Sequence, residues 1–161
     1  IPAPLYTTYG YMLLTRSGVA GNFAMNVGSA TEMQLDSILV NTFGAGYWSG
    51  NKTFTNASAV AMKLIVSGRA MPSASVANTS CYFDTSFKIY NSSNALLYTA
   101  GRQNLHPIPD DSTFFSIAPT ACIYLNPGEY FRWQVYVVNT GFNIVGDGGS
   151  DKCELNICQV P

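Results

Sequence analysis

Residues 121–138 constrain the fold of this chain more than any other stretch. They read A-C-I-Y-L-N-P-G-E-Y-F-R-W-Q-V-Y-V-V, which is two apolar runs around an Asn-Pro-Gly tripeptide at 126–128. Proline presets φ at the first corner of a turn, and glycine adopts positive φ without steric cost, so this tripeptide predicts a tight turn. After the turn the side chains alternate with the period of a β-strand. One face of that strand belongs in a protein core: Phe131, Trp133, Val135 and Val137.

The opposite face of the same predicted strand is amphipathic rather than simply charged. It carries Tyr130, Arg132, Gln134 and Tyr136, which we call the mixed face. Aromatic residues and arginine with little other charge are the composition of a protein–protein interface. We therefore predict that the mixed face is an oligomer interface. The alternative is that the chain's own N-terminal strand or a loop covers it.

Other segments also have the pattern of short strands. The cleanest alternation lies in residues 81–90, and it is followed by a hairpin turn, N-S-S-N at 91–94, and a return strand at 95–100. Residues 57–70 alternate too, except that Ile65 places an apolar side chain among the polar ones. The predicted inward set of that segment is Val60, Met62, Leu64 and Val66. The remaining strands are expected within residues 5–16, 33–41, 53–55, 114–118 and 152–160.

Together these segments predict an all-β domain. We expect about eight to ten short strands and no amphipathic helix, which is typical of a sandwich or barrel. Long crossings, some of them rich in glycine and including loops at 101–112 and 140–150, favour a Greek-key jelly roll over a simple meander. The length of 161 residues suits one domain, 1–161, with residues 1–4 expected to be the end of an upstream linker or stalk.

The charge content narrows the range of partners. Charged residues make up 11% of the chain, which is less than half of the usual share of about 25%. The formal net charge is −1, which provides no electrostatic footprint for nucleic acid.

No apolar run reaches the roughly 18 residues that a membrane span needs. We predict an extracellular or virion-surface location. Four N-x-S/T sequons are weak evidence of a secretory route: Asn51, Asn56, Asn78 and Asn91.

Four cysteines, Cys81, Cys122, Cys153 and Cys158, allow two disulfides in principle. The C-x4-C spacing at 153–158 does not match a zinc site, which needs a second pair or histidines. In a strand, Cys153 and Cys158 would face opposite sides at about 16 Å, too far apart to bridge. We expect most of the cysteines to be buried thiols that behave as small hydrophobes.

No catalytic arrangement is visible, so we do not expect an enzyme. The only histidine, His106, lies in a predicted loop, and no nucleophile elbow is present. The adjacent Asp110 and Asp111 are most simply solvated loop carboxylates. Asp147 and Asp151, within D-G-G-S-D, are the best metal candidates, and calcium is the ion that such oxygen ligands would take. An ordinary turn is the simpler explanation, and we expect no cofactor.

A glycine-rich corner at 41–55 holds the best candidates for ligand binding. Tyr47 and Trp48 offer aromatic faces for stacking on a sugar ring, and Asn51 offers an amide for its hydroxyl groups. The alternative is a structural crossing in which both rings pack underneath.

Two segments resemble C1q/TNF-like domains. L-N-P-G-E-Y-F-R-W-Q-V-Y at 125–136 is similar to that family's L-x-x-G-D/E-x-V-x-L-x-V segment. N-T-F-G-A-G-Y-W-S-G-N-K-T-F-T at 41–55 resembles its N-x-G-x-x-Y-x-x-x-x-G-x-F-x corner, with Lys52 or Thr53 in place of the final glycine. The family's G-x-Y-x-F and S-x-F-S-G segments are absent. The resemblance covers roughly residues 38–157 and extends to the broader class of jelly-roll heads, which includes viral spike and fibre heads.

The resemblance implies a homotrimer, with the mixed face as the contact between subunits. We therefore expect a non-enzymatic, surface-displayed trimeric domain that recognises a cell-surface receptor or glycan, of the virion spike or fibre-head type. Two alternatives remain open. One is a purely structural capsid, coat or decoration protein, and the other is a secreted C1q-like lectin.

Overall fold

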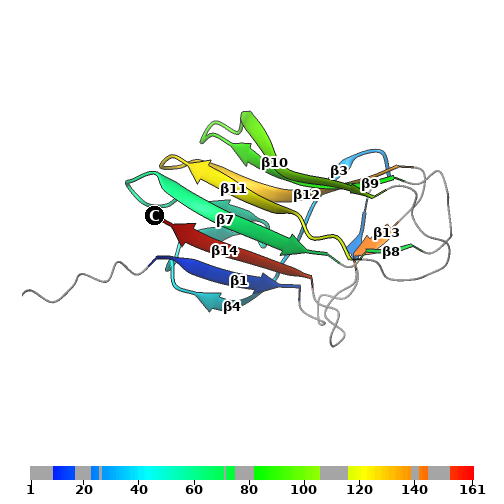
Figure 1. Ribbon diagram of the computed structural model, residues 1–161, viewed down its shortest axis with the longest axis horizontal. Helices are drawn as coiled ribbons and strands as arrows, with labels where there is room; N and C mark the ends of the chain where they lie inside the picture. The colour runs from blue at the N-terminus through cyan, green and yellow to red at the C-terminus, as the bar shows by residue number, and fades with distance from the viewer. Residues whose placement is uncertain are drawn as a thin grey trace, which may run out of the picture.

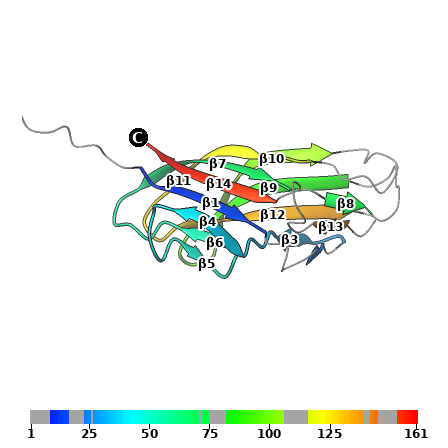
Figure 2. The same ribbon diagram turned by 90° about the horizontal axis from the view of Figure 1, so that it is seen from below.

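The computed structural model describes residues 9–16, 23–25, 27–70, 72–74, 82–105, 116–138, 142–144 and 153–161. Within these ranges the regular elements are fourteen β-strands, whose pairings are antiparallel. Two large sheets face each other as the layers of a sandwich (Figures 1 and 2). No helix in the described part of the chain is long and apolar enough to cross a membrane.

The first layer is a five-stranded sheet. Its strands are, in order across the sheet, β11 (Thr120–Leu125), β7 (Met62–Arg69), β14 (Glu154–Val160), β1 (Tyr11–Thr15) and β4 (Ser37–Asn41). Strands that are neighbours here are far apart in sequence, as a jelly roll requires.

The second layer is a six-stranded sheet. Its path is β10 (Leu96–Leu105), β9 (Tyr82–Tyr90), β12 (Tyr130–Val138), β6 (Thr53–Thr55) and β5 (Trp48–Ser49), and β3 (Ala30–Glu32) also pairs with β12. A small third sheet joins β2 (Phe23–Ala24), β13 (Phe142–Ile144) and β8 (Pro72–Ala74).

Alternation along the strands places the core between the two layers. Phe131, Trp133, Val135 and Val137 of β12 are buried as predicted. They meet Met62, Leu64 and Val66 of β7 and Phe83, Phe87 and Ile89 of β9, which belong to the same core. Val60 was expected to point inward, but it lies before β7 begins and is exposed.

The Asn-Pro-Gly turn is confirmed, and it has a topological role. The N–H of Glu129 donates to the carbonyl oxygen of Asn126 at 3.0 Å, and Gly128 has φ of +79°. These are the features of a type II turn. Because β11 belongs to one sheet and β12 to the other, the turn carries the chain between layers rather than closing a hairpin.

The 91–94 hairpin between β9 and β10 is also confirmed. Its second strand is longer than predicted, since β10 continues to Leu105 where a loop was expected from residue 101. Gly101, with φ of +60°, lies at an irregularity of the pairing between Ala100 and Gln103. A glycine in this conformation forms a bulge, which lets the strand continue past the apparent break.

The expectation that most cysteines are buried is wrong for two of them. Cys122 and Cys158 are exposed free thiols, while Cys153 is buried. Both exposed cysteines lie at outward positions of the five-stranded sheet, because their strands β11 and β14 alternate in register with β7. Cys81, His106 and residues 1–4 lie outside the described residues.

Candidate functional site

Two outward faces of the sandwich carry the features that bear on function. The first is the outer face of the six-stranded sheet, where the mixed face of β12 lies between β9 on one side and β6 and β3 on the other. The strand register sets Tyr130 opposite Tyr90, Arg132 opposite Lys88, Gln134 opposite Ser86, and Tyr136 opposite Asp84. The mixed face is partly buried by these neighbours, and no N-terminal strand lies over it within the described structure.

One end of this face is held by charge and ring contacts. Arg132 Nη1 pairs with Glu32 Oε1 at 2.7 Å, and Lys52 Nζ pairs with the other oxygen of Glu32 at 2.6 Å. The rings of Tyr90 and Tyr130 stack with centroids 5.2 Å apart, and the Arg132 guanidinium lies over both. Arg132 and Tyr130 are thus already engaged within the subunit.

The ionisation of two groups at this end is shifted. Partial burial of Glu32 raises the pKa of its carboxyl, but the hydrogen bonds and charges of Lys52 and Arg132 outweigh it, so the net pKa is lowered. Burial raises the pKa of the Tyr90 phenol, and the hydrogen bond that it accepts from the Gln134 amide at 3.2 Å opposes the rise only in part. Both groups therefore keep their ordinary charge at neutral pH.

A second ion pair lies at the other end of the face. Arg102 Nε donates to Asp84 Oδ2 at 2.6 Å, and the Tyr82 hydroxyl donates to the same oxygen at 2.8 Å. Asp84 is buried although its strand position points outward, because Arg102 from β10 covers it. The Asp84 carboxylate in turn raises the pKa of Arg102.

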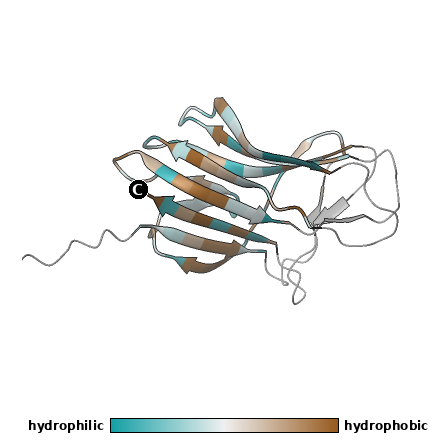
Figure 3. Ribbon diagram, viewed as in Figure 1, coloured by the Kyte–Doolittle hydropathy of each residue, from teal (hydrophilic) through white to brown (hydrophobic). Residues whose placement is uncertain are grey.

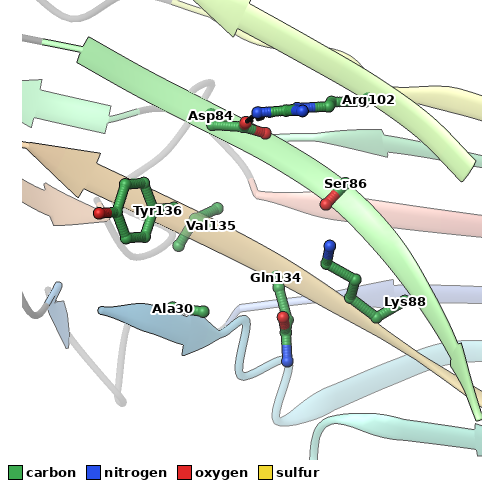
Figure 4. Close-up of a pocket in the computed structure, with 8 residues that line it drawn as sticks. All are labelled: Ala30, Asp84, Ser86, Lys88, Arg102, Gln134, Val135 and Tyr136. Carbon is green, nitrogen blue, oxygen red and sulfur yellow. Dashed lines mark hydrogen bonds and ion pairs between the residues drawn. The ribbon is translucent and has the colours of Figure 1, made fainter. Parts of the chain in front are cut away.

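Between these two ends the surface is hollowed into a groove of about 230 Å³, which we call the polar groove (Figure 4). Its lining comes from β9, β12, β10 and β3: Ala30, Asp84, Ser86, Lys88, Arg102, Gln134, Val135 and Tyr136. Sequence reasoning placed Gln134 and Tyr136 on a functional surface, but it missed Asp84, Ser86, Lys88 and Arg102. For Asp84, Ser86 and Lys88 the only signal in the sequence was the alternation of residues 81–90, which places them on the outward face of the strand.

The second face is the outer side of the five-stranded sheet. In register across it lie Cys122, Ile65, Cys158 and Tyr11, one from each of four strands. The next row holds Thr120, Ser67, Asn156 and Leu13. We call these eight residues the uncharged face. Figure 3 shows apolar residues alternating with polar ones along the strands of this sheet.

Apolar side chains continue from this face to the open edge of the sandwich. Tyr124 on β11 and Leu96, Leu97 and Tyr98 on β10 are exposed large hydrophobic residues. The Tyr98 hydroxyl donates to the carbonyl oxygen of Tyr124 at 2.9 Å and accepts from its N–H at 3.0 Å. This exchange joins the edge strands of the two sheets into one surface, which we call the β10–β11 edge.

The candidate sugar-binding residues lie in the corner around β5. Tyr47 packs its ring against Phe43 and Phe54, with centroids 5.3 Å and 5.8 Å apart, and Trp48 also packs against the core. Asn51 is in the turn before β6 with φ of +58°. The two rings are therefore partly used in packing, and a ligand role for Tyr47, Trp48 and Asn51 stays a prediction.

The candidate calcium ligands Asp147 and Asp151 lie outside the described residues. Within the described ranges no group of three or more His, Cys, Asp or Glu side chains is placed to hold a metal ion.

Comparison with known proteins identifies the fold. No family model and no curated protein matches the chain. Crystal structures of murine APRIL match 95% of this chain and 100% of theirs, with TM-scores of 0.61 at pH 8.5 and pH 5.0 and identities of 8% and 11%. The structure of Eiger TNF from S. frugiperda matches 95% of this chain and 93% of its own, with a TM-score of 0.57 and 8% identity. The predicted all-β jelly-roll sandwich of C1q/TNF-like type is confirmed.

Proposed function

We propose that this chain is a non-enzymatic, surface-displayed homotrimeric domain that recognises a receptor or glycan. The observation that carries the proposal is the uncharged face together with the β10–β11 edge. Exposed apolar side chains gather on the edge and at Ile65 of the face, among uncharged polar neighbours, and such groups of exposed apolar residues mark protein–protein contacts.

The uncharged face has the composition of a subunit interface. Its two central rows contain no charged side chain, and charges occur only at its ends, at Lys63 and at the Arg69–Glu154 pair. Depletion of charge at the centre of a patch is what distinguishes an interface from other surface. Ile65, the apolar residue that interrupted the polar side of its strand, lies in the middle of this face with 47% of its surface exposed.

The face and the edge are different surfaces of one subunit, and this geometry suits a ring. When the edge of one subunit packs against the face of the next, the contact is heterologous, and repeating it by rotation closes a cyclic oligomer. That the ring contains three subunits is what the resemblance to C1q/TNF-like domains implies.

The sequence-based prediction placed the contact on the mixed face instead. It stays a prediction, but Arg132, Tyr130 and Gln134 already have partners within the subunit. A contact there would have to compete with those interactions or cover them, whereas Ile65 and Leu97 gain burial at no such cost.

Two variants with the same new residue separate the two interfaces. Ile65→Glu places a carboxylate in the uncharged face, and Gln134→Glu places one in the mixed face. We expect sedimentation velocity to show a trimer for the wild type and for Gln134→Glu, and a monomer for Ile65→Glu, because a buried unpaired charge opposes association. The reverse pattern would assign the interface to the mixed face, and a wild-type monomer at micromolar concentration would refute the trimer.

We further propose that the domain is a displayed head of the virion spike or fibre type. The low charge content of 11% supports a particle surface rather than the cytosol. Binding of the trimer to host cells or to a glycan array is the test. A trimer that binds neither would indicate a coat or decoration protein that only assembles, and loss of glycan binding on Trp48→Ala would favour a lectin that uses the 41–55 corner.

A further inference from the structure

We infer that the polar groove on the six-stranded sheet is a binding site for an acidic sugar, a single ring that carries a carboxylate. This inference rests on the proposed recognition function and names the ligand class for it. The groove lies on the sheet opposite to the uncharged face, so the proposed trimer leaves it open.

The first argument is the excess of positive charge around the groove. Four of the chain's eight lysines and arginines are on this face of the described structure: Lys52, Lys88, Arg102 and Arg132. Only two carboxylates, those of Glu32 and Asp84, form ion pairs with these four cations in the described structure. A local excess of cations on a chain whose net charge is −1 attracts an anion to this place.

Lys88 is the cation that lacks a carboxylate. Among the ion pairs of the described residues none includes Lys88, and its ammonium donates only to Thr99 Oγ1, at 2.9 Å. It lies directly opposite Arg132 in the strand register. The charge of Arg132 is already matched by Glu32, so Lys88 is the cation that an anion in the groove would meet.

Ser86 provides an independent observation. The residue is 95% buried by the strands around it, since its relative exposure is 5%, yet its side chain lines the groove. No hydrogen bond to the Ser86 hydroxyl is found within the described structure, and the hydroxyl is not sealed from solvent. Figure 4 shows Ser86 and Lys88 of β9 beside each other, with Gln134 of β12 near them. A hydroxyl held at the floor of a groove without a protein partner is placed to bond a ligand.

The remaining lining favours a sugar over an inorganic anion or an acidic peptide. Oδ2 of Asp84 already accepts from Arg102 and Tyr82, and its second carboxylate oxygen can accept only from a ligand that donates, which sugar hydroxyls do and sulfate does not. The apolar lining is limited to Ala30, Val135 and the Tyr136 ring, which leaves no pocket for an apolar peptide anchor. The volume of about 230 Å³ is below that of sites for drug-sized ligands and suits one ring.

The test compares two probes that differ only in the carboxylate. Methyl β-glucuronide and methyl β-glucoside are titrated into the wild-type protein, and binding is followed by NMR chemical-shift changes. We expect the glucuronide to bind with a Kd in the millimolar range, as suits so small a ligand, and the neutral glucoside at least about tenfold more weakly.

Three variants locate the site. Lys88→Gln should weaken glucuronide binding about tenfold, because it removes the unpaired cation. Ser86→Ala should weaken it several-fold while the unfolding midpoint stays unchanged, since the hydroxyl has no protein partner to lose. Lys63→Gln removes the same charge on the other sheet and should leave binding unchanged.

Several outcomes would overturn the inference. These are equal binding of the two glycosides, no binding of the glucuronide, equal loss in Lys63→Gln and Lys88→Gln, or tighter binding of an oligoglutamate peptide or of sulfate than of the glucuronide. Sedimentation velocity on the same samples tests the trimer separately from the sugar site. A trimer that binds no glucuronide refutes the sugar site alone, and a monomer that binds it refutes the trimer alone.

Discussion

Trp133 is the largest buried side chain of the core, and two contacts fix its position. Its indole N–H donates to Thr85 Oγ1 on the neighbouring strand at 2.6 Å. Its six-membered ring lies against Gly68 in the facing sheet, where a methyl group added to the glycine would come within 2.8 Å of two ring atoms. The absence of a side chain at residue 68 is what lets the indole fit between the layers.

We predict that Gly68→Ala destabilises the fold by about 1–3 kcal/mol, because the added carbon overpacks the core against a rigid ring. Urea denaturation followed by tryptophan fluorescence measures the change. Ser93→Ala, in the exposed turn between β9 and β10, is the surface control and should shift the midpoint little. An unchanged midpoint for Gly68→Ala would mean that the two sheets separate easily at this point.

At the scale of elements, β3 has only three residues, and Glu32 adds ion pairs to its backbone pairing with β12. The strand pairs with β12, and Glu32 accepts from Arg132 of β12 and from Lys52 in the turn before β6. One carboxylate therefore ties three segments of the six-stranded sheet. Its lowered pKa means that the folded state favours the ionised form more than the unfolded chain does.

We predict that Glu32 makes the protein less stable in acid. Because folding lowers the pKa of Glu32, its ionised carboxylate stabilises the folded state fully at pH values above the ordinary pKa of 4.5. This stabilisation is lost as the pH falls from 4.5 through the lowered pKa of the folded state. Glu32→Gln should lose about 1 kcal/mol at pH 7 and show a shallower loss of stability between pH 5 and 3. Denaturation midpoints over this range test it, with Glu154→Gln, whose ion pair is longer at 3.9 Å, as the charge control.

At the scale of the whole molecule, the two outward faces divide the work that we propose. The uncharged face and the β10–β11 edge serve assembly, and the six-stranded sheet presents its polar groove to solvent. The two sheets form opposite layers, so one surface can be buried without loss of the other (Figure 2).

This division predicts that stability depends on protein concentration. Association with the native state alone raises the apparent stability by mass action. The thermal midpoint of the wild type should therefore rise with concentration, and that of Ile65→Glu should not. Calorimetry over a hundredfold range of concentration measures it. A wild-type midpoint independent of concentration over that range would contradict assembly through this face.

Several features of the fold follow from the sequence by itself. The alternation in residues 130–138 predicts which β12 side chains are buried, because the period of a strand is a local property. The Asn-Pro-Gly turn is equally local, since proline and glycine restrict their own dihedral angles. The resemblance of residues 125–136 and 41–55 to C1q/TNF-like domains led to the correct fold.

The tertiary structure alone decided which side chains meet on each outward face. A strand pattern separates inward from outward but does not tell which strands are neighbours, and here those neighbours are distant in sequence. Ile65 lies between Cys122 and Cys158 only because β7 is paired with β11 and β14. Likewise, Asp84 is buried and Ser86 opens into a groove because β10 and β12 flank β9. Charge pairing and hollows on a sheet arise from such long-range register, which no local pattern contains.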